Sequence, residues 1–143
     1  MNKKIRGTKS IVYNNIRFKS TLECNCYKKL EEAGLNPSYE SEKIVLMEGF
    51  RPSIKLISPN KTKELVECTK KILNITYTPD FVVTKGNYKI YFDAKGIAND
   101  TYPIKKKLFL KHLENRADGV NYIFIEPHSI KQILQAIDYI KSL

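Results

Sequence analysis

Two aspartates flank the open end of a predicted β-hairpin. The sequence of residues 74–95 predicts two strands joined by a tight turn at Gly86-Asn87. If the hairpin turns symmetrically about that pair, Asp80 stands opposite Asp93, with Cβ atoms roughly 5 Å apart. Two like charges so close destabilise a hairpin unless a positive charge lies between them. The spacing therefore predicts a bound divalent cation.

Lys95 lies two residues after Asp93 and projects from the same face of the strand. The opposite face is expected to be apolar and to enter the core. Its residues are Phe81, Val83, Ile90, Phe92 and Ala94. A bulged three-residue loop would instead shift the register by one and move the aspartates off opposition. Each charged side chain alone also fits a solvated strand edge, but the combination favours one core face and one reactive face.

The order of these residues resembles the motif of the PD-(D/E)XK nucleases. The matching residues are Pro79-Asp80 and Asp93-Ala94-Lys95, with Asp93 where glutamate is commoner. The wider pattern is similar to small phage-encoded endonucleases of the Holliday-junction-resolvase type. It comprises Lys19-Ser20-x-x-Glu23, Tyr77-Thr78-Pro79-Asp80-Phe81 and Asp93-x-Lys95-Gly96, and covers roughly residues 17–126.

The resemblance implies a restriction-endonuclease-like core and metal-dependent hydrolysis of DNA, with branched DNA as the expected substrate. The implied catalytic residues are Glu23, Asp80, Asp93 and Lys95, and the implied metal ligands are Asp80, Asp93, the Ala94 carbonyl and Glu23. Mg²⁺ suits this set because it prefers hard oxygen ligands, and Mn²⁺ is expected to substitute. Lys95 would orient or help deprotonate the attacking water, or pair with the phosphate.

Glu23 has two interpretations. Ser20-x-x-Glu23 is a capping box, in which the glutamate reaches back to the backbone N–H of Ser20. Many nucleases of the resembled family also carry an acid in the helix before the hairpin. The resemblance therefore favours a metal-binding role for Glu23, and its position in the first helical turn is compatible with both.

The chain is strongly basic, with 25 Lys plus Arg against 15 Asp plus Glu and a net charge of +10 over 143 residues. Such an excess favours a polyanionic partner, and nucleic acid ahead of an anionic membrane. The predicted DNA contacts are Arg17, Lys19, Tyr102, Lys105, Lys107 and Lys111. The lysines of the predicted helix also fit its solvated side.

The remaining elements predict an α/β fold with a mixed central sheet flanked by helices. They are a helix over 20–33, strands over 42–51 and 53–57, the hairpin, a helix from about 102 to 116, a strand over 122–126 and a helix over 130–140. Residues 60–73 fit either a short helix or a strand connection. We expect a basic arm over 1–19 and a single domain over 20–143.

Apolar spacing predicts the buried face of the last two helices. One carries Ile104, Leu108, Phe109 and Leu113, and the other carries Ile130, Ile133, Leu134, Ile137 and Ile140.

The longest purely apolar runs, such as 44–47 and 122–125, have four residues, so no membrane span is expected. Three cysteines without metal-ligand spacing favour the reducing cytoplasm of a bacterium or a phage-infected host.

Three functions agree with these features. The first is a Mg²⁺-dependent endonuclease selective for branched DNA, acting as a homodimer because a symmetrical junction suits two active sites. The second is a non-catalytic DNA-binding or regulatory protein on a nuclease-like fold. The third is a nuclease of linear duplex or transposon ends.

Overall fold

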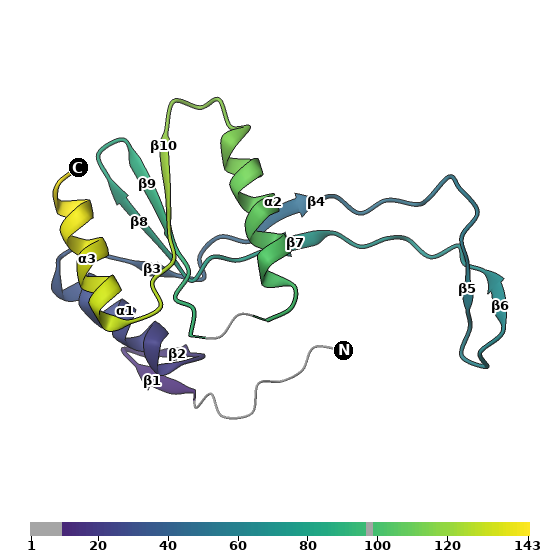
Figure 1. The fold of residues 1–143 in the computed structure, drawn as a ribbon, viewed down its shortest axis with the longest axis horizontal. Coiled ribbons are helices and arrows are strands. Elements are labelled where there is room, and N and C mark those ends of the chain that lie inside the picture. The colour runs from purple at the N-terminus through teal and green to yellow at the C-terminus, as the bar shows by residue number, and fades with distance from the viewer. Residues whose placement is uncertain (1–9, 97–98) are drawn as a thin grey trace.

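A computed structural model of the chain describes residues 10–96 and 99–143. It is a mixed α/β structure built on a four-stranded sheet of order β10-β9-β8-β3 (Figure 1). The strands are β3 (Ser38–Tyr39), β8 (Phe81–Lys85), β9 (Tyr88–Phe92) and β10 (Asn121–Ile125). β10 and β9 are parallel, whereas the other neighbours are antiparallel, so the sheet is mixed as predicted.

The β8–β9 hairpin has the predicted register. Phe81 pairs with Phe92 and Lys85 pairs with Tyr88, which leaves Gly86-Asn87 as the turn. Gly86 has a φ of +56°, a left-handed conformation that glycine adopts without the clash of a side chain. No bulge interrupts the pairing, so Asp80 and Asp93 are the next residues outward from the first pair.

Helices cover both faces of the sheet (Figure 1). α1 (Thr21–Glu32) and α3 (Ile130–Lys141) pack on the face that carries Phe81, Val83, Ile90, Phe92 and Ala94, and α2 (Tyr102–Glu114) packs on the other. The apolar face is confirmed, but the expectation of a wholly reactive opposite face is wrong. Val82 and Tyr91 are buried there beneath α2, and only the end of the hairpin is polar. No helix among the described residues is both long and apolar enough to cross a membrane.

The helix ends follow local chemistry. Ser20 caps α1 by accepting a bond from the backbone N–H of Glu23 at 3.1 Å, and Ser129 caps α3 in the same way. Thr101 makes no side-chain cap to α2, which begins with Pro103 in its first turn and ends two residues earlier than predicted. Gly34, just beyond α1, has a φ of +75°.

The predicted apolar faces of α2 and α3 are too wide. Tyr102, Phe109 and Leu113 of α2 are buried, but Ile104 and Leu108 are exposed. On α3, the buried residues are Ile133, Ala136, Ile137 and Ile140, and the exposed ones are Ile130 and Leu134. Periodicity marks which residues share a face, but the extent of the covering layer decides which of them are buried.

The N-terminal segment contributes a small hairpin. β1 (Ile11–Tyr13) pairs with β2 (Ile16–Phe18) through a turn at Asn14 and Asn15, both of which have positive φ. The side chain of Phe18 is fully buried in the core formed with α1. Residues 1–9 of the predicted basic arm lie outside the described residues.

The segment between β3 and β8 forms a long two-stranded extension (Figure 1). At its root, β4 (Ile44–Met47) pairs with β7 (Ile75–Tyr77), and at its tip, β5 (Ile57–Pro59) pairs with β6 (Leu65–Glu67). We call residues 48–74 the arm. Residues 60–73 thus form a turn and a returning strand, and the strand predicted at 53–57 begins only at Ile57.

The strand predicted across residues 74–83 is broken in two. β7 ends at Tyr77 and belongs to the root of the arm, whereas β8 begins at Phe81 in the central sheet. Pro79 lies in the break, where it has no N–H to donate to a neighbouring strand. Asp80 therefore lies at the junction of the arm and the sheet.

Candidate functional site

Asp93 and Lys95 lie just beyond the carboxyl end of β9, where the backbone is still held beside the chain that follows β10. Beyond β9 the parallel pairing with β10 continues, because the backbone N–H of Asp93 donates to Ile125 O at 3.0 Å and that of Lys95 donates to Pro127 O at 3.1 Å. Both residues are thus held in an extended conformation, with their side chains on the same side of the chain. Asp80 approaches from the neighbouring strand, and its Oδ2 accepts a bond from the backbone N–H of Ala94 at 2.8 Å.

Asp93 is buried between a hydroxyl and an amine. The side chain is 1% exposed. The hydroxyl of Tyr77 donates to its Oδ2, and Lys95 Nζ lies 2.6 Å from its Oδ1. That amine approaches outside hydrogen-bonding geometry, so Oδ1 has no hydrogen-bond donor among the described residues. One oxygen of this carboxylate is therefore left with an ionic partner alone.

Glu23 reaches the same place from α1. Its side chain is 7% exposed, and its Oε2 accepts bonds from the hydroxyl of Tyr39 at 3.0 Å and from the backbone N–H of Lys19 at 3.1 Å. The capping interpretation is correct in kind, but the glutamate reaches the N–H of Lys19 instead of that of Ser20. Burial raises the pKa of Glu23, although both donors oppose this effect. Glu23 thus both caps the helix and presents a carboxylate to the hairpin end.

A hollow of about 300 Å³ joins these groups. We call it the acidic pocket. Its walls are Lys19, Glu23, Tyr77, Thr78, Asp80, Asp93, Lys95, Asn99, Thr101, Tyr102 and Lys105. All four predicted catalytic residues line it, together with three of the predicted DNA contacts. The Ala94 side chain points into the core on the opposite face, so only its backbone faces the acids.

The other predicted DNA contacts do not meet at this pocket. Arg17 lies on β2, where its Nη1 donates to Ser10 Oγ at 3.4 Å. Lys107 and Lys111 lie on exposed positions of α2. Lys19, in contrast, lines the pocket, and its Nζ lies 2.6 Å from Glu40 Oε1. Spacing along α2 alone therefore does not identify which lysines face the acids.

The crowding of carboxylates changes their acidity. Burial raises the pKa of Asp80 well above its ordinary value, and the negative charges of Asp93 and Glu23 raise it further. Lys95 and the Ala94 N–H act in the opposite direction but do not compensate. Ionisation of both aspartates is thus unfavourable in the protein without a bound cation, and an added cation would stabilise the ionised pair.

The donor set fits a hard divalent cation in chemistry. Asp80 and Asp93 supply buried carboxylate oxygens, and no described residue donates a hydrogen bond to the Oδ1 of Asp93. Within residues 10–96 and 99–143, however, no three His, Cys, Asp or Glu side chains gather tightly enough to hold a metal ion together. The acids of the pocket therefore offer two close carboxylates and a third from α1, short of a closed cage.

Lys95 also contacts Tyr102, which belongs to a network around Glu126 that was not predicted from the sequence. Lys95 Nζ lies 4.4 Å from the centroid of the Tyr102 ring, and the Tyr102 hydroxyl donates to Glu126. Glu126 also contacts Lys106 at 3.0 Å and His128 at 3.2 Å. Glu126 follows β10 directly, and parallel strands end at the same edge of a sheet. Knowledge of the parallel β9–β10 pairing would therefore have predicted its position.

Two tyrosines were also missed as site residues. Tyr77 donates to Asp93 and Tyr39 donates to Glu23. Tyr77 belongs to the Tyr-Thr-Pro-Asp-Phe pattern, which was a signal for it, whereas nothing in the local sequence distinguishes Tyr39. Burial and the nearby carboxylates raise the pKa of both tyrosines, so both hydroxyls stay protonated and act as donors.

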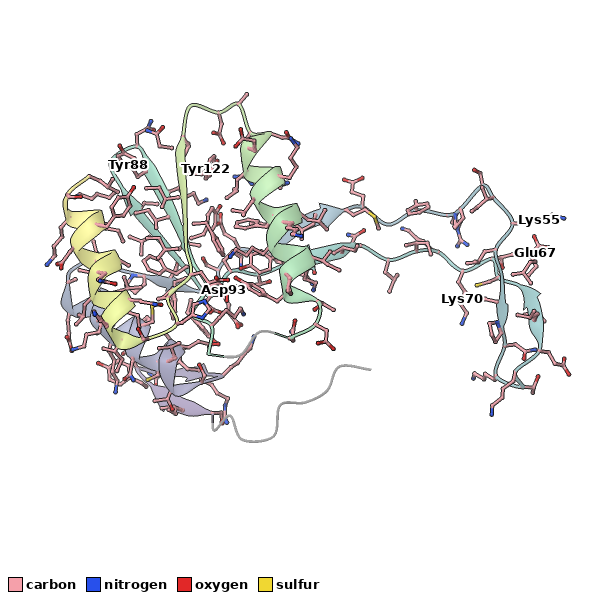
Figure 2. All side chains as sticks on the ribbon, in the orientation of Figure 1. Lys55, Glu67, Lys70, Tyr88, Asp93 and Tyr122 are labelled. Atoms are coloured by element: carbon pink, nitrogen blue, oxygen red, sulfur yellow. The ribbon has the colours of Figure 1, made fainter. Side chains whose placement is uncertain are left out.

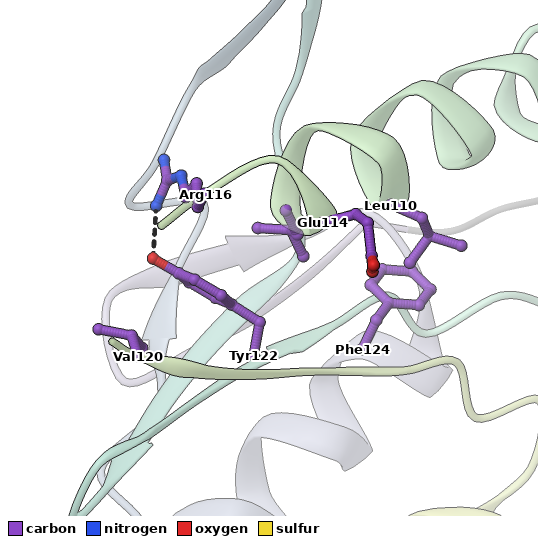
Figure 3. A pocket seen from close by; sticks show the side chains of 7 residues that line it. Leu110, Glu114, Arg116, Val120, Tyr122 and Phe124 are labelled. Atoms are coloured by element: carbon purple, nitrogen blue, oxygen red, sulfur yellow. Dashed lines mark hydrogen bonds between the residues drawn. The ribbon is translucent and has the colours of Figure 1, made fainter. Parts of the chain in front are cut away.

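A second hollow, of about 310 Å³, lies between the end of α2 and β10 (Figure 3). Leu110, Val120 and Phe124 line it, and the guanidinium of Arg116 donates to the Tyr122 hydroxyl at 3.0 Å across it. It contains Glu114 but no pair of acids. The acidic pocket is therefore the stronger candidate for chemistry.

The fold and site define a mixed α/β protein with an acid-and-lysine pocket at the open end of a β-hairpin. Residues 2–124 match a family described as "Protein of unknown function (DUF1064)", and the chain belongs to that family. No curated protein and no solved structure matches the chain significantly.

Proposed function

We propose that this protein is a metal-dependent DNA endonuclease with a restriction-endonuclease-like core of the PD-(D/E)XK kind. The observation that carries the proposal is the convergence of Glu23, Asp80, Asp93 and Lys95 in one pocket, although they come from three separate parts of the chain. Buried acids are expensive to maintain without a function, because burial destabilises their charged forms. The mixed sheet with helices on both faces supports the same class.

Each residue of the pocket has a role in this chemistry. Asp80, Asp93 and the carbonyl of Ala94 would hold Mg²⁺ or Mn²⁺, with Glu23 available as a further ligand. The bound cation would supply charge neutralisation at the phosphate and a lower pKa for the attacking water. Lys95 would orient that water or pair with a phosphate oxygen, while its contact with the Tyr102 ring restricts where the amine can lie.

Branched DNA is the proposed substrate. This substrate is implied by the resemblance to small phage-encoded endonucleases of the Holliday-junction-resolvase type, and selection by DNA shape requires no reading of bases. A four-way junction presents two equivalent strands, and two copies of the protein would cut them symmetrically. Sedimentation with and without a junction tests whether two copies assemble.

The deciding experiment compares wild type with Asp80→Asn on a labelled four-way junction, a linear duplex of the same sequence and a single strand. Each reaction contains Mg²⁺, Mn²⁺ or EDTA. We expect paired nicks on the junction that require metal and vanish in the variant. Equal cutting of the linear duplex would support the nuclease function but contradict selectivity for branched DNA. No cutting by wild type with either metal would contradict the nuclease function.

A DNA-binding protein that does not cleave is the second candidate. The observation that favours it is the 2.6 Å contact between Lys95 and Asp93, which neutralises a proposed metal ligand, together with the lack of a closed three-ligand cluster among the described residues. Binding of the junction in EDTA, with affinity unchanged by Mg²⁺ and by Asp80→Asn, would support this candidate.

A further inference from the structure

Among the described residues, none forms a second layer on either side of the arm, residues 48–74 (Figure 1). It projects away from the three helices, and Figure 2 shows Lys55, Glu67 and Lys70 near its far end. Large apolar side chains are exposed along it. They are Phe50, Ile54, Ile57, Leu65, Val66 and Leu73. A two-stranded ribbon without a packed face is marginally stable in water, so its surface is suited to a partner.

The arm is nevertheless held as a ribbon along its length. Phe50 and Ile72 exchange backbone hydrogen bonds of 2.9 and 2.7 Å near the root, and the N–H of Cys68 donates to Leu56 O at 2.8 Å before the tip. The guanidinium of Arg51 also donates to Thr69 O at 2.9 Å. These cross-strand bonds support an extended surface that exists before any partner binds.

The turn at the tip presents two lysines from a restrained backbone. Asn60 Oδ1 accepts bonds from the backbone N–H groups of Thr62 and Glu64, at 2.9 and 3.0 Å, and from the Thr62 hydroxyl at 2.8 Å. Lys63 has a φ of +63°, which is uncommon for a residue with a side chain. Lys61 and Lys63 are both exposed on this turn.

The charges of the arm point to the kind of partner. It contains six basic residues, Arg51, Lys55, Lys61, Lys63, Lys70 and Lys71, against the three acids Glu48, Glu64 and Glu67. Within the part of the chain that the structure describes, none of the six forms an ion pair. A second copy of this +10 chain would bring charge of the same sign, whereas a phosphate backbone brings the opposite sign.

The root of the arm connects it to the acidic pocket. β7 ends at Tyr77, which lines that pocket and donates to Asp93, and Thr78 of the pocket wall follows directly. Double-stranded DNA has a major groove that admits a two-stranded β-ribbon. From these observations we infer that the arm binds duplex DNA beside the pocket, with the tip lysines on phosphates. The choice of DNA as the partner rests on the proposed function.

The test compares two double variants that remove the same charge. Lys61→Ala/Lys63→Ala changes the tip of the arm, and Lys131→Ala/Lys141→Ala changes exposed positions of α3. Binding to 12-bp and 30-bp duplexes is measured in EDTA, so that no cleavage interferes, over a series of salt concentrations. Circular dichroism checks that both variants keep the wild-type fold.

The arm variant should bind the 30-bp duplex about tenfold or more weakly than wild type at 0.1 M salt. Its log-log salt dependence should be shallower by about 2, because each lost phosphate contact removes about 0.9 from the slope. The ratio of its affinity for the 30-bp duplex to that for the 12-bp duplex should also be smaller than in wild type. The α3 variant should resemble wild type in all three measurements. Equal behaviour of the two variants would overturn the inference.

Two further outcomes separate this inference from the proposed function. If the arm variant binds DNA more weakly than wild type but wild type cuts no DNA with any metal, the inference about the arm stands and the proposed nuclease function is wrong. If wild type cuts DNA but the arm and α3 variants bind DNA equally well, the proposed nuclease function stands and the inference about the arm is wrong. A shift from dimer to monomer in the arm variant, with unchanged DNA affinity, would overturn the inference in favour of a contact with a second copy.

Discussion

Carboxylates are buried in the acidic pocket, whereas the charged side chains of the arm are exposed. Glu23, Asp80 and Asp93 are at most 7% exposed, and each accepts a hydrogen bond from a named donor. The arm instead exposes lysines to solvent beside apolar side chains such as Leu65, which is 71% exposed. The two regions are nevertheless adjacent, because β7 runs from the arm to the pocket.

This difference shows that the side chains of the pocket, unlike those of the arm, are positioned before a ligand binds. Burial of the acids is unfavourable for their charges, but it determines where each oxygen lies before a ligand arrives. The arm has a hydrogen-bonded backbone, but its lysines and most of its large apolar side chains are exposed, which suits a surface completed by binding. We therefore expect pocket variants to alter the chemical step and core stability, and arm variants to alter affinity.

Lys95→Met should give the largest effect. The change removes the amine beside Asp93 but keeps an apolar stem against Tyr102, so cleavage should fall by about 10²–10³-fold while DNA binding stays near wild type. Single-turnover cleavage in Mg²⁺ and binding in EDTA measure the two quantities. Lys141→Met, at the end of α3, is the matched control. Similar losses in both variants would mean that the pocket lysine has no special role.

Core and arm substitutions should differ sharply in stability. Phe109 is fully buried, with its ring centroid 4.8 Å from that of Tyr77 and 5.1 Å from that of Tyr91, so Phe109→Ala should destabilise the fold by about 3–5 kcal/mol. Leu65→Ala on the arm should change the free energy of unfolding by about 0.5 kcal/mol or less. Urea denaturation measures both. If Leu65→Ala instead lowers the free energy of unfolding strongly, and more so at higher protein concentration, copies of the protein already bury the arm against one another.

The carboxyl group of Asp80 should make the metal-free protein less stable as pH rises. Burial beside Asp93 and Glu23 raises its folded-state pKa from 3.8 to about 8. Between these values the folded protein holds a proton that the unfolded chain has released. This stabilising contribution is therefore complete below about pH 4 and is lost as pH rises through about 8. Asp80→Asn should be more stable than wild type at pH 8 by about 1 kcal/mol or more.

Urea denaturation in EDTA at pH 5 and pH 8 checks this sign. The difference between Asp80→Asn and wild type should grow with pH, and Mg²⁺ at pH 8 should stabilise wild type more than the variant. Lys61→Ala/Lys63→Ala should leave the pH profile unchanged, because the arm is exposed. A difference that shrinks as pH rises would contradict the raised pKa of Asp80.

Tyr102→Phe should give the smallest effect. It removes the hydroxyl that donates to Glu126 but keeps the ring beside the Lys95 amine, so cleavage should fall only a few-fold. Tyr102→Ala should cost clearly more, because Lys95 then loses its lateral support. Rates at saturating DNA compare the two variants. Equal losses would show that the hydroxyl, and not the ring, is the important group.

Several features were predictable because they depend on neighbours in the chain. The Gly86-Asn87 turn predicted the pairing of Phe81 with Phe92, and hence the closeness of the two aspartates. The exposed Ile104 was predicted wrongly, because periodicity shows which side chains share a face but not how far a neighbouring layer extends. The break at Pro79 was missed because residue types typical of strands, Ile75 to Tyr77 and Phe81 to Val83, lie on both sides of it.

By itself, the sequence determined the hairpin register, the ends of α1 and the identity of the acid-and-lysine set, since turn chemistry, caps and residue types are local properties. Only the tertiary structure decided that Glu23 reaches the hairpin, that the hydroxyls of Tyr39 and Tyr77 hold carboxylates, and that residues 48–74 leave the domain as an arm. The physical reason is that these contacts join segments far apart in the chain, and they exist only once helices and strands have packed into layers.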